Sequence, residues 1–373
     1  MACESLASSH VMNGGDGEYS YTRNSSLQRS GIENIKVLIN QGIAEKLELQ
    51  QIISSSSSPS TKTFVIADLG CSVGPNTFIA MQNIMEAVKL KWESSSSCIN
   101  PKDEHAPLEF QVFFNDHVSN DFNQLFQSLP PNNRSFAAGV PGSFYTQLFP
   151  DASIHFVHSS YTLHWLSSVP RELVDKTSPA YNKGRVFCIS APNEVVEAYL
   201  GQFAKDMESF LNARAREIVC GGLMALYIPC RPEGSPDNCH SLSPTHLFGT
   251  ILMDMAQMGL VSEAKIDSFN LPHYFPTSRE MEALMRRNTC FTIENFELLV
   301  PSVERLSDSD IPVWVSHCRA GYEGLFRDHF GDDIIEQLFD MFSKKMEQTF
   351  KGFDRSNSKP VVECFILLKR NRA

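Results

Sequence analysis

The chain has 373 residues and a formal net charge of −11 at pH 7. Its composition, 42% hydrophobic and 20% charged, is typical of a globular protein, and the acidic balance disfavours nucleic acid or an anionic membrane as the main partner. No apolar run approaches the roughly 20 residues of a membrane helix, and the opening residues lack the features of a secretory signal. We therefore expect a cytoplasmic protein whose ten cysteines, none in a CxxC pair, stay reduced.

Hydrophobic periodicity predicts helices alternating with short buried strands. Helical spacing of apolar residues is found at 24–49, 77–90 and 198–219, and the last helix is expected to stop at Gly221 and Gly222. Strand patterns occur at 64–68, 110–114, 154–158, 185–190, 223–228 and 364–368. This alternation predicts an α/β fold with a mostly parallel sheet that helices cover on both faces.

The second half of the chain departs from this alternation. Residues 245–350 have helical patterns and no clear strand, which indicates a helical cap inserted before the last strand. We expect an α/β core formed by 1–230 and 353–373, and a mainly helical cap formed by 231–352.

A glycine-containing turn follows the first predicted strand, in the sequence FVIADLGCSVGPN at 64–76. A strand, a glycine turn and a helix in this order bind nucleotides at the carboxyl end of a parallel strand. Ser72 occupies the place of the second glycine of a dinucleotide fingerprint, where its Cβ would crowd a pyrophosphate. Asp68, Gly70 and Gly74 instead suit a ligand without phosphate, such as the amino-acid end of S-adenosylmethionine. The alternative is a tight turn that binds nothing.

Two further segments favour an adenosine ligand. Asp116, at the end of the next strand, is placed to accept both ribose hydroxyls, or alternatively to cap the following helix. Ser143 and Phe144 follow a rigid glycine turn and could contact adenine or its sugar; the alternative is a surface turn with one core aromatic residue.

A cluster of rings follows the strand at 154–158. Tyr161, His164 and Trp165 have the i, i+3, i+4 spacing of one helical face, which would line a pocket beside the nucleotide or pack into the core.

On these motifs the chain resembles the plant SABATH methyltransferases, which use S-adenosylmethionine to methylate small carboxylic acids or ring nitrogens. The resemblance implies a Rossmann-like class I methyltransferase sheet with a helical cap, and a homodimer. The matching segments are Met12–Gly15, Tyr19–Tyr21, Asn24 and Ser25, Gln28, 66–76, 114–123, 139–149, 158–166 and 269–272.

The resemblance also implies roles for individual residues. Gln28 and Trp165 match the pair whose N–H groups hold the acceptor carboxylate. Further acceptor contacts are expected from the neighbouring His164 and from the cap and strand residues His273, Tyr274, Cys318, Thr245, His246 and 223–228. The positions that surround the methyl donor are Tyr21, Ser25, Asp68, Cys71, Asn76, Asp116, His117, Ser143, Phe144, Ser160 and Tyr161. A magnesium site recorded in some relatives matches Asn182, Asp267, Phe269 and Asn270, although a structural role for Asp267 is the better interpretation.

The sequence departs from the family pattern at three places. Asn13 replaces a lysine of the opening motif, and His164 replaces a methionine of the salicylate-type relatives. The segments around Trp165 and Tyr181 look like the loganate-type branch, yet Thr245 stands where the loganate form has a sugar-binding histidine, with His246 one place later.

The predicted chemistry is carboxyl methylation of a small terpenoid, aromatic or hormone-type acid. Such an acid is already ionised at pH 7, so no general base is required, and catalysis consists mainly of positioning for in-line displacement. Neutral donors would not overstabilise the ground-state anion, which loses its charge during transfer.

Four other functions remain as alternatives. One is an N-methyltransferase of a xanthine-type alkaloid, and another is a nicotinamide-dependent oxidoreductase, which Ser72 disfavours. Residues 70–74 also spell the G-x-S-x-G of a serine hydrolase, but no strand precedes Phe64 to supply an oxyanion loop. The fourth is a protein that binds the ligands without catalysis.

Overall fold

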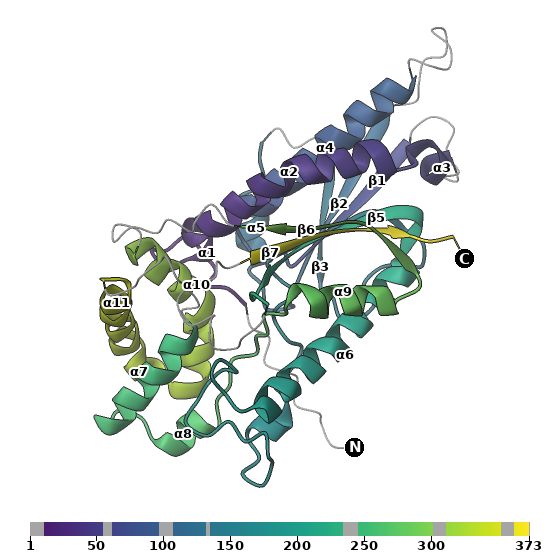
Figure 1. Ribbon diagram of the computed structural model, residues 1–373. Helices are drawn as coiled ribbons and strands as arrows, with labels where there is room; N and C mark the ends of the chain where they lie inside the picture. Colours follow the sequence, from purple (N-terminus) through teal and green to yellow (C-terminus); the bar gives the residue numbers. More distant parts are fainter. Residues whose placement is uncertain are drawn as a thin grey trace, which may run out of the picture.

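A central sheet of seven strands carries the candidate site (Figure 1). The computed structural model describes residues 11–54, 62–96, 107–131, 135–233, 245–300, 311–351 and 362–372. In these residues the strand order is β3-β2-β1-β4-β5-β7-β6. The strands are β1 (Lys62–Leu69), β2 (Leu108–Asp116), β3 (Ser135–Pro141), β4 (Ile154–Ser160), β5 (Ile218–Cys230), β6 (Phe291–Leu299) and β7 (Val362–Arg370).

The pairing of β1 defines where a ligand can bind. β1 is parallel to β2 on one side and to β4 on the other, and the chain crosses over between these two neighbours. The carboxyl ends of β1 and β4 therefore flank a topological switch point, which is the usual ligand crevice of an open α/β sheet. β7 pairs antiparallel with both β5 and β6, so the predicted mostly parallel sheet is confirmed, with an antiparallel edge.

Alternate residues of β5 face two separate hydrophobic cores. Leu223, Ala225 and Tyr227 pack on one face with apolar residues of α2 and α4, and Met224 and Leu226 pack on the other with residues of α6. Figure 1 shows α2 beside α4, and the two helices contact each other. The helices of the first half are α1 (Tyr21–Asn24), α2 (Ser26–Lys46), α3 (Leu49–Ser54), α4 (Pro75–Ser96) and α5 (Phe122–Gln127).

Most helices of the second half gather at one end of the sheet (Figure 1). Phe248 of α7 stacks on Phe342 of α11 with ring centroids 4.5 Å apart, and it contacts Phe326 of α10 at 4.7 Å, so these three helices share an aromatic core. The helical segments are η1 (Arg171–Leu173), α6 (Asn193–Glu217), α7 (Thr245–Gln257), α8 (Glu263–Asp267), α9 (Ser278–Arg287), α10 (Ile311–Phe330), η5 (Asp332–Ile334) and α11 (Ile335–Lys351).

The structure corrects several predicted elements. Residues 185–190 form bends and turns instead of a strand, and β3 was not predicted. α6 ends at Glu217 and β5 begins at the next residue, so Gly221, with φ +84°, lies inside a strand and does not end a helix. The predicted cap also contains an unpredicted strand, β6, at the edge of the sheet. The division into core and cap remains a prediction.

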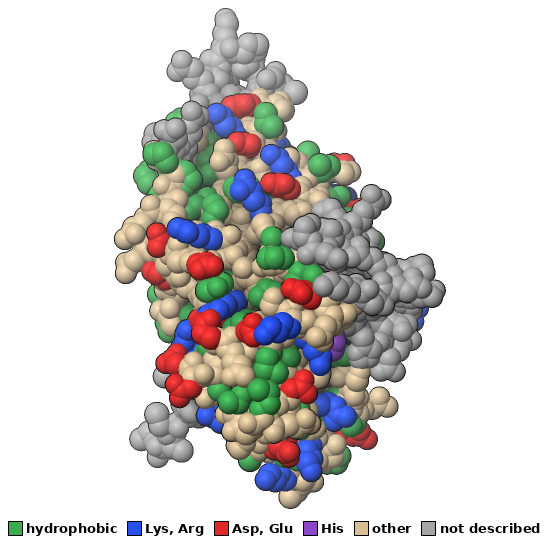
Figure 2. Space-filling view, turned by 90° about the vertical axis from the view of Figure 1, so that its left-hand side faces the viewer, with side chains coloured by type: hydrophobic (Ala, Val, Ile, Leu, Met, Phe, Trp, Pro, Cys, Tyr) green, Lys and Arg blue, Asp and Glu red, His purple; other side chains and the backbone are tan. Residues whose placement is uncertain are grey.

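Charged side chains of both signs are interspersed on the face drawn in Figure 2. None of the helices in the described residues is long and apolar enough to cross a bilayer.

Candidate active site

The turn after β1 is held close to the end of β4. Gly70 has φ +82°, and a Cβ there would lie 2.1 Å from Thr162 Cγ2, so both the backbone conformation and the close approach require glycine. Ser72 also has a positive φ, of 51°. Its Oγ is buried and, in the described residues, has no hydrogen-bond partner, so the serine of a hydrolase triad is not formed here.

Asp68, at the end of β1, is buried and its carboxylate is engaged by protein groups. Oδ1 lies 2.7 Å from His158 Nδ1, and Oδ2 accepts a hydrogen bond from the Thr77 hydroxyl group. His158 Nε2 remains buried without a partner in the described residues. The sequence did not single out His158, which orients Asp68 from the neighbouring strand.

Asp116, at the end of β2, links two strand ends. Its Oδ2 accepts from the Ser72 N–H at 2.7 Å, and its Oδ1 accepts from the His117 N–H at 2.8 Å. Burial raises the pKa of the Asp116 carboxyl group, and the two N–H groups oppose that rise. The alternative of a helix cap was wrong, because Asp121 caps α5 by accepting from the Gln124 N–H.

The N-terminal segment lies over the β1 turn. Asn76 Nδ2 donates to the Ser25 carbonyl oxygen at 2.9 Å, and Thr22 Oγ1 donates to that of Val73 at 2.8 Å. Burial is the main cause that raises the pKa of the Tyr21 phenol group, and the nearby charges of Asp116 and Asp68 raise it further. The residues of this segment that are predicted to bind the methyl donor thus lie at the carboxyl ends of β1 and β2.

The same segment also contacts α10. The Asn13 N–H donates to the Ala320 carbonyl oxygen at 2.9 Å, and the Arg319 guanidinium lies 3.8 Å from the centre of the Tyr19 ring. Residues 13–25 therefore bridge the β1 turn and α10.

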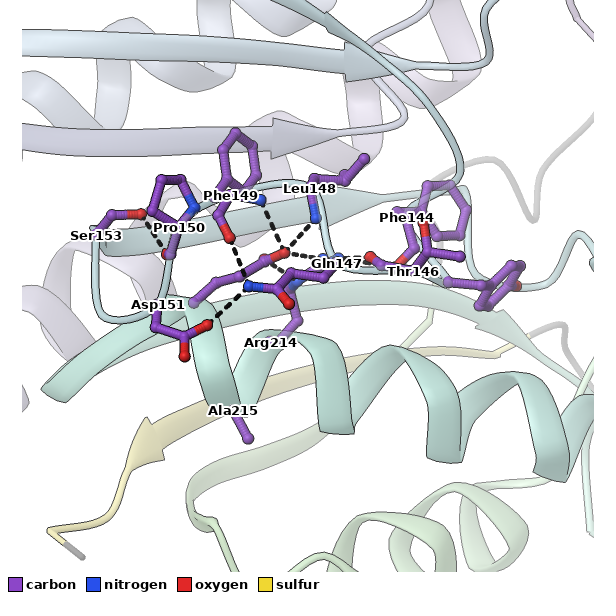
Figure 3. Close-up of polar contacts among 12 residues, drawn as sticks. Phe144, Thr146, Gln147, Leu148, Phe149, Pro150, Asp151, Ser153, Arg214 and Ala215 are labelled. Atoms are coloured by element: carbon purple, nitrogen blue, oxygen red, sulfur yellow. Dashed lines mark hydrogen bonds and ion pairs between the residues drawn. The ribbon is translucent and has the colours of Figure 1, made fainter.

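A buried ion pair supports the loop that carries Ser143 and Phe144 (Figure 3). Arg214 donates to the carbonyl oxygens of Phe144 and Thr146, at 2.8 and 3.0 Å. Glu217, its partner on α6, accepts from the Phe149 N–H. The Phe144 side chain is buried, and its ring centre lies 4.7 Å from that of Tyr145, as expected for the alternative of a core aromatic residue.

Tyr145 connects the two halves of the site. Its hydroxyl group donates to the Trp165 carbonyl oxygen at 2.6 Å. The loop predicted for adenine and the residue predicted for the acceptor are thus joined by one hydrogen bond, a link that sequence spacing alone did not indicate.

The end of β4 sends Tyr161 and Trp165 to different sides, which contradicts the predicted single helical face. Residues 161–166 are not helical, and Tyr161 has φ +56°. Its hydroxyl group donates to Glu363 of β7, and its ring packs against Gly31 of α2, where a Cβ would lie 2.3 Å from the hydroxyl oxygen. Ser160, just before it, keeps a buried Oγ without a partner in the described residues.

Trp165 and His164 lie in a group of rings. Trp165 lies edge-to-face with His273, with centroids 3.6 Å apart, and 5.9 Å from Tyr322 of α10. His164 stacks on Phe275 at 5.3 Å, and burial lowers the pKa of His164 to about 3, so its imidazole is neutral. The group brings together the predicted His164, Trp165 and His273 and adds Tyr322 and Phe275.

Gln28, the other predicted carboxylate ligand, lies one helical turn before Gly31 on α2. Its Nε2 is 3.4 Å from His317 Nε2, and its buried Oε1 has no partner in the described residues. Because Gly31 touches Tyr161, this part of α2 lies against the end of β4. Sequence reasoning did not single out His317.

The remaining predicted acceptor residues are placed differently from one another. Cys318 is buried on α10, close enough to Tyr322 to influence its pKa, which burial raises most strongly. The Tyr274 hydroxyl group forms hydrogen bonds with Arg231 and Glu280, so it is already engaged by protein groups. His246 is half-buried on α7, the Thr245 side chain lies outside the described residues, and 223–228 is a buried inner strand.

Three of the four predicted magnesium ligands form side-chain hydrogen bonds with protein groups. Asp267 accepts from the Tyr181 hydroxyl group at 2.9 Å and from the Gly184 N–H at 2.7 Å, and Asn182 donates to Asn270 at 2.6 Å. Phe269 packs its ring against α10 residues such as Phe326. In the described residues no group of three or more His, Cys, Asp or Glu side chains is placed to hold a metal. Asp267 thus holds the 181–184 turn, whereas Asn182 Oδ1 is buried without a hydrogen-bond partner in the described residues, so the magnesium site stays a prediction.

Comparison with known proteins defines the class. Residues 7–371 match the family model described as SAM dependent carboxyl methyltransferase. The loganic acid O-methyltransferase of Catharanthus roseus is 45% identical over 99% of this chain and 96% of its own length. A solved structure of a loganic acid methyltransferase with SAH superposes with a TM-score of 0.89 at 45% identity, covering 97% of this chain and 99% of that one. Paraxanthine methyltransferase 2 of Arabidopsis thaliana is more distant, at 35% identity over 97% of this chain and 98% of its own length.

The chain belongs to the family of S-adenosylmethionine-dependent carboxyl methyltransferases, the SABATH family. It is an O-methyltransferase, and S-adenosylmethionine is its methyl donor.

Proposed function

We propose that this enzyme esterifies a small or medium-sized acid of the terpenoid, aromatic or hormone type, with loganate as the first candidate. The observation that carries the proposal is the group of rings around Trp165. His164 is neutral, and Trp165 makes ring contacts with His164, His273 and Tyr322. Such a site orients an anion without holding it by full charge, which favours a reaction in which the anion is neutralised.

The donor would be held at the carboxyl ends of β1, β2 and β4. Buried polar atoms without a partner in the described residues, Ser72 Oγ, His158 Nε2 and Ser160 Oγ, provide capacity for a polar ligand there. Each Asp116 oxygen accepts one N–H and has a further lone pair for a ribose hydroxyl group. The N-terminal segment, which is bonded to the β1 turn, would exclude water from the donor. When bound, S-adenosylmethionine supplies an activated sulfonium methyl group.

Gln28 and Trp165 would bind and orient the acceptor carboxylate. Their side-chain N–H groups are neutral donors, so they direct one carboxylate oxygen without lowering its nucleophilicity as much as a cation would. A carboxylic acid with a pKa near 4 is ionised at pH 7, so no residue is required as a base.

Loganate is favoured over other acids by the similarity to the Catharanthus enzyme, which is named for that substrate. The ring group around Trp165 mixes apolar faces with hydrogen-bonding groups such as the Tyr322 hydroxyl group. An acid of mixed polarity suits this ring group better than a purely apolar one.

The test is transfer of labelled methyl from S-adenosylmethionine to a panel of loganate, salicylate, benzoate, jasmonate, indole-acetate, gibberellins, farnesoate and xanthines. A labelled methyl ester of one acid would support the proposal and identify the substrate. Label only on a xanthine nitrogen would contradict it. Absence of label with every acid, while the donor still binds, would also contradict this choice of acids.

A homodimer, a cytoplasmic location and magnesium binding were implied by the resemblance or composition and remain predictions. Light scattering on the purified enzyme measures its mass against 41.8 kDa for one chain. Methyl transfer with and without a chelator tests the magnesium prediction, which the contacts of Asp267 make the weakest of the three.

A further inference from the structure

His317 of α10 connects Asn24, the last residue of α1, with Gln28 of α2. Its Nδ1 lies 3.1 Å from the Asn24 carbonyl oxygen, and its Nε2 lies 3.4 Å from Gln28 Nε2. The imidazole is thus sandwiched between a backbone acceptor and the side-chain amide predicted to hold the substrate. Trp314, one helical turn earlier on α10, places its ring edge-to-face at 5.9 Å and restricts the His317 ring.

We propose that His317 is a positioning residue that fixes the orientation of the Gln28 amide and thereby selects a carboxylate acceptor. This inference rests on the role proposed above for Gln28. Neither the sequence comparison nor the proposed reaction assigns any role to His317.

The first step concerns the proton on the imidazole. A carbonyl oxygen can only accept, so the ring nitrogen facing Asn24 must carry the hydrogen. Burial lowers the pKa of His317, which keeps the ring neutral at pH 7. Its Nε2 therefore presents a lone pair to Gln28.

The second step concerns the amide. Facing a lone pair, Gln28 gains a hydrogen bond only when its NH2 group points at His317, because its Oε1 would be repelled there. One of the two Nε2 hydrogens is then used by His317 and the other is left in a fixed direction. The buried Oε1 has no partner in the described residues, so no group on that side holds the amide in the opposite orientation.

The third step concerns selectivity. A carboxylate accepts hydrogen bonds and donates none, so it matches the second N–H of Gln28. A neutral ring that presents its own N–H to the same hydrogen gains nothing and loses its hydration. Without His317 the amide would rotate freely, and its oxygen would face the carboxylate for part of the time.

The test compares His317→Phe, which removes the acceptor, with His317→Gln, whose amide can donate to Asn24 and accept from Gln28. Losing one fixed hydrogen bond predicts that H317F raises the acid KM and lowers kcat, with about a tenfold loss in kcat/KM. We expect H317Q to recover most of this loss. Ser316→Ala, the neighbouring position on α10, is the matched control. Donor affinity, measured by calorimetry, should be equal in all of them.

Two kinetic outcomes would overturn the proposal: H317F with the kcat/KM of the unmodified enzyme, or H317Q as impaired as H317F. The second result would mean that the ring matters only for packing. Selectivity gives a further criterion, since H317F should lose more activity on the acid than on any ring-nitrogen acceptor that the enzyme accepts.

A readout independent of turnover separates this inference from the proposed function. In the enzyme labelled with nitrogen-15 histidine, the His317 signal, assigned by its loss in H317Q, should show a protonated Nδ1 and an unprotonated Nε2. A protonated Nε2 would refute the inference even if acids are esterified. Failure to esterify any acid, with the expected tautomer present, would refute the proposed function and leave the His317–Gln28 hydrogen bond standing.

Discussion

Arg214 and Glu217, three residues apart on α6, form an ion pair with no exposed side-chain surface, in which Nε and Oε2 are 2.7 Å apart. Neither residue is among those predicted to bind the methyl donor or the acceptor. The pair satisfies backbone groups of the loop at 144–149: Arg214 donates to carbonyl oxygens, and Glu217 accepts from an N–H group. The loop predicted to contact adenine therefore takes its conformation from two charges that the helix buries beneath it.

Removing one member of this pair should be strongly destabilising. Arg214→Met leaves Glu217 buried and uncompensated, so we expect a loss of about 3–5 kcal/mol in the free energy of unfolding. The double variant R214M/E217Q removes both charges and should be more stable than R214M alone. Urea unfolding measures both. If the loss of unfolding free energy in the double variant equalled the sum of the losses in R214M and in E217Q alone, the two residues would not be coupled.

Gly70→Ala should abolish donor binding. The added Cβ would meet Thr162 Cγ2 at 2.1 Å, and φ +82° is disfavoured for alanine, so the β1 turn must shift. We expect the affinity for S-adenosylmethionine in calorimetry to fall at least about a hundredfold, since a displaced turn costs several hydrogen bonds. Gly201→Ala is the control, because a Cβ there meets nothing within 4 Å. Retained affinity in G70A would show that the turn adapts.

Trp165→Ala and Gln28→Ala should each cripple turnover while donor binding is spared. Both side chains are predicted to orient the acceptor, and they contact His273 and His317, respectively. Losing a positioning contact made in the transition state predicts about a hundredfold fall in kcat/KM for the acid. Near-normal turnover in both variants would remove the roles assigned to these residues.

Mild acid should destabilise the fold through His155. This buried histidine stacks on Phe64, and its Nδ1 accepts from the Val65 N–H at 2.9 Å. Burial lowers the pKa of His155 to about 4 from 6.5. The folded protein therefore favours the neutral imidazole. The resulting stabilisation is complete above pH 6.5 and is lost as the pH falls toward 4, because the unfolded chain binds the proton first.

The slope of the unfolding free energy measures this effect. One histidine contributes about 1.4 kcal/mol per pH unit within that window, and His164, with its pKa of about 3, adds a second contribution. His155→Gln keeps an acceptor for Val65 and removes one titrating group, so its slope between pH 6 and 5 should be shallower by about 1 kcal/mol per unit. An unchanged slope would exclude His155 as a source.

The buried parallel strands were predictable because short apolar runs mark them, as residues 64–67 of β1 illustrate. The two edge strands were not. β3 has no buried residue, and β6 alternates polar and apolar residues irregularly around a register shift at Ile293 and Asn295. Residues 185–190 have the apolar content of a strand, but they are held in turns by contacts such as that of Asp267 with Gly184.

The site was predictable where its residues follow strand ends, because parallel strands finish at one edge of the sheet. The supporting residues were not predictable in this way. His158, Tyr145 and His317 act on residues between 20 and 289 positions away in the chain, and no local spacing encodes such pairs. The positive φ of Tyr161 likewise depends on its partners in α2 and β7 and turned it away from the predicted helical face.

The N-terminal segment has a kinetic consequence, because it touches both the β1 turn, through Thr22, and α10, through Asn13. A methyl donor bound at the β1 turn, where it is predicted to bind, would exchange with solvent only when those bonds open. The spent donor and the new ester would then leave through the same event, and their residence times would lengthen or shorten together. Each turnover would end with the release of residues 13–25 and not with the chemical step, so substitutions in this segment would alter kcat without altering the reaction itself.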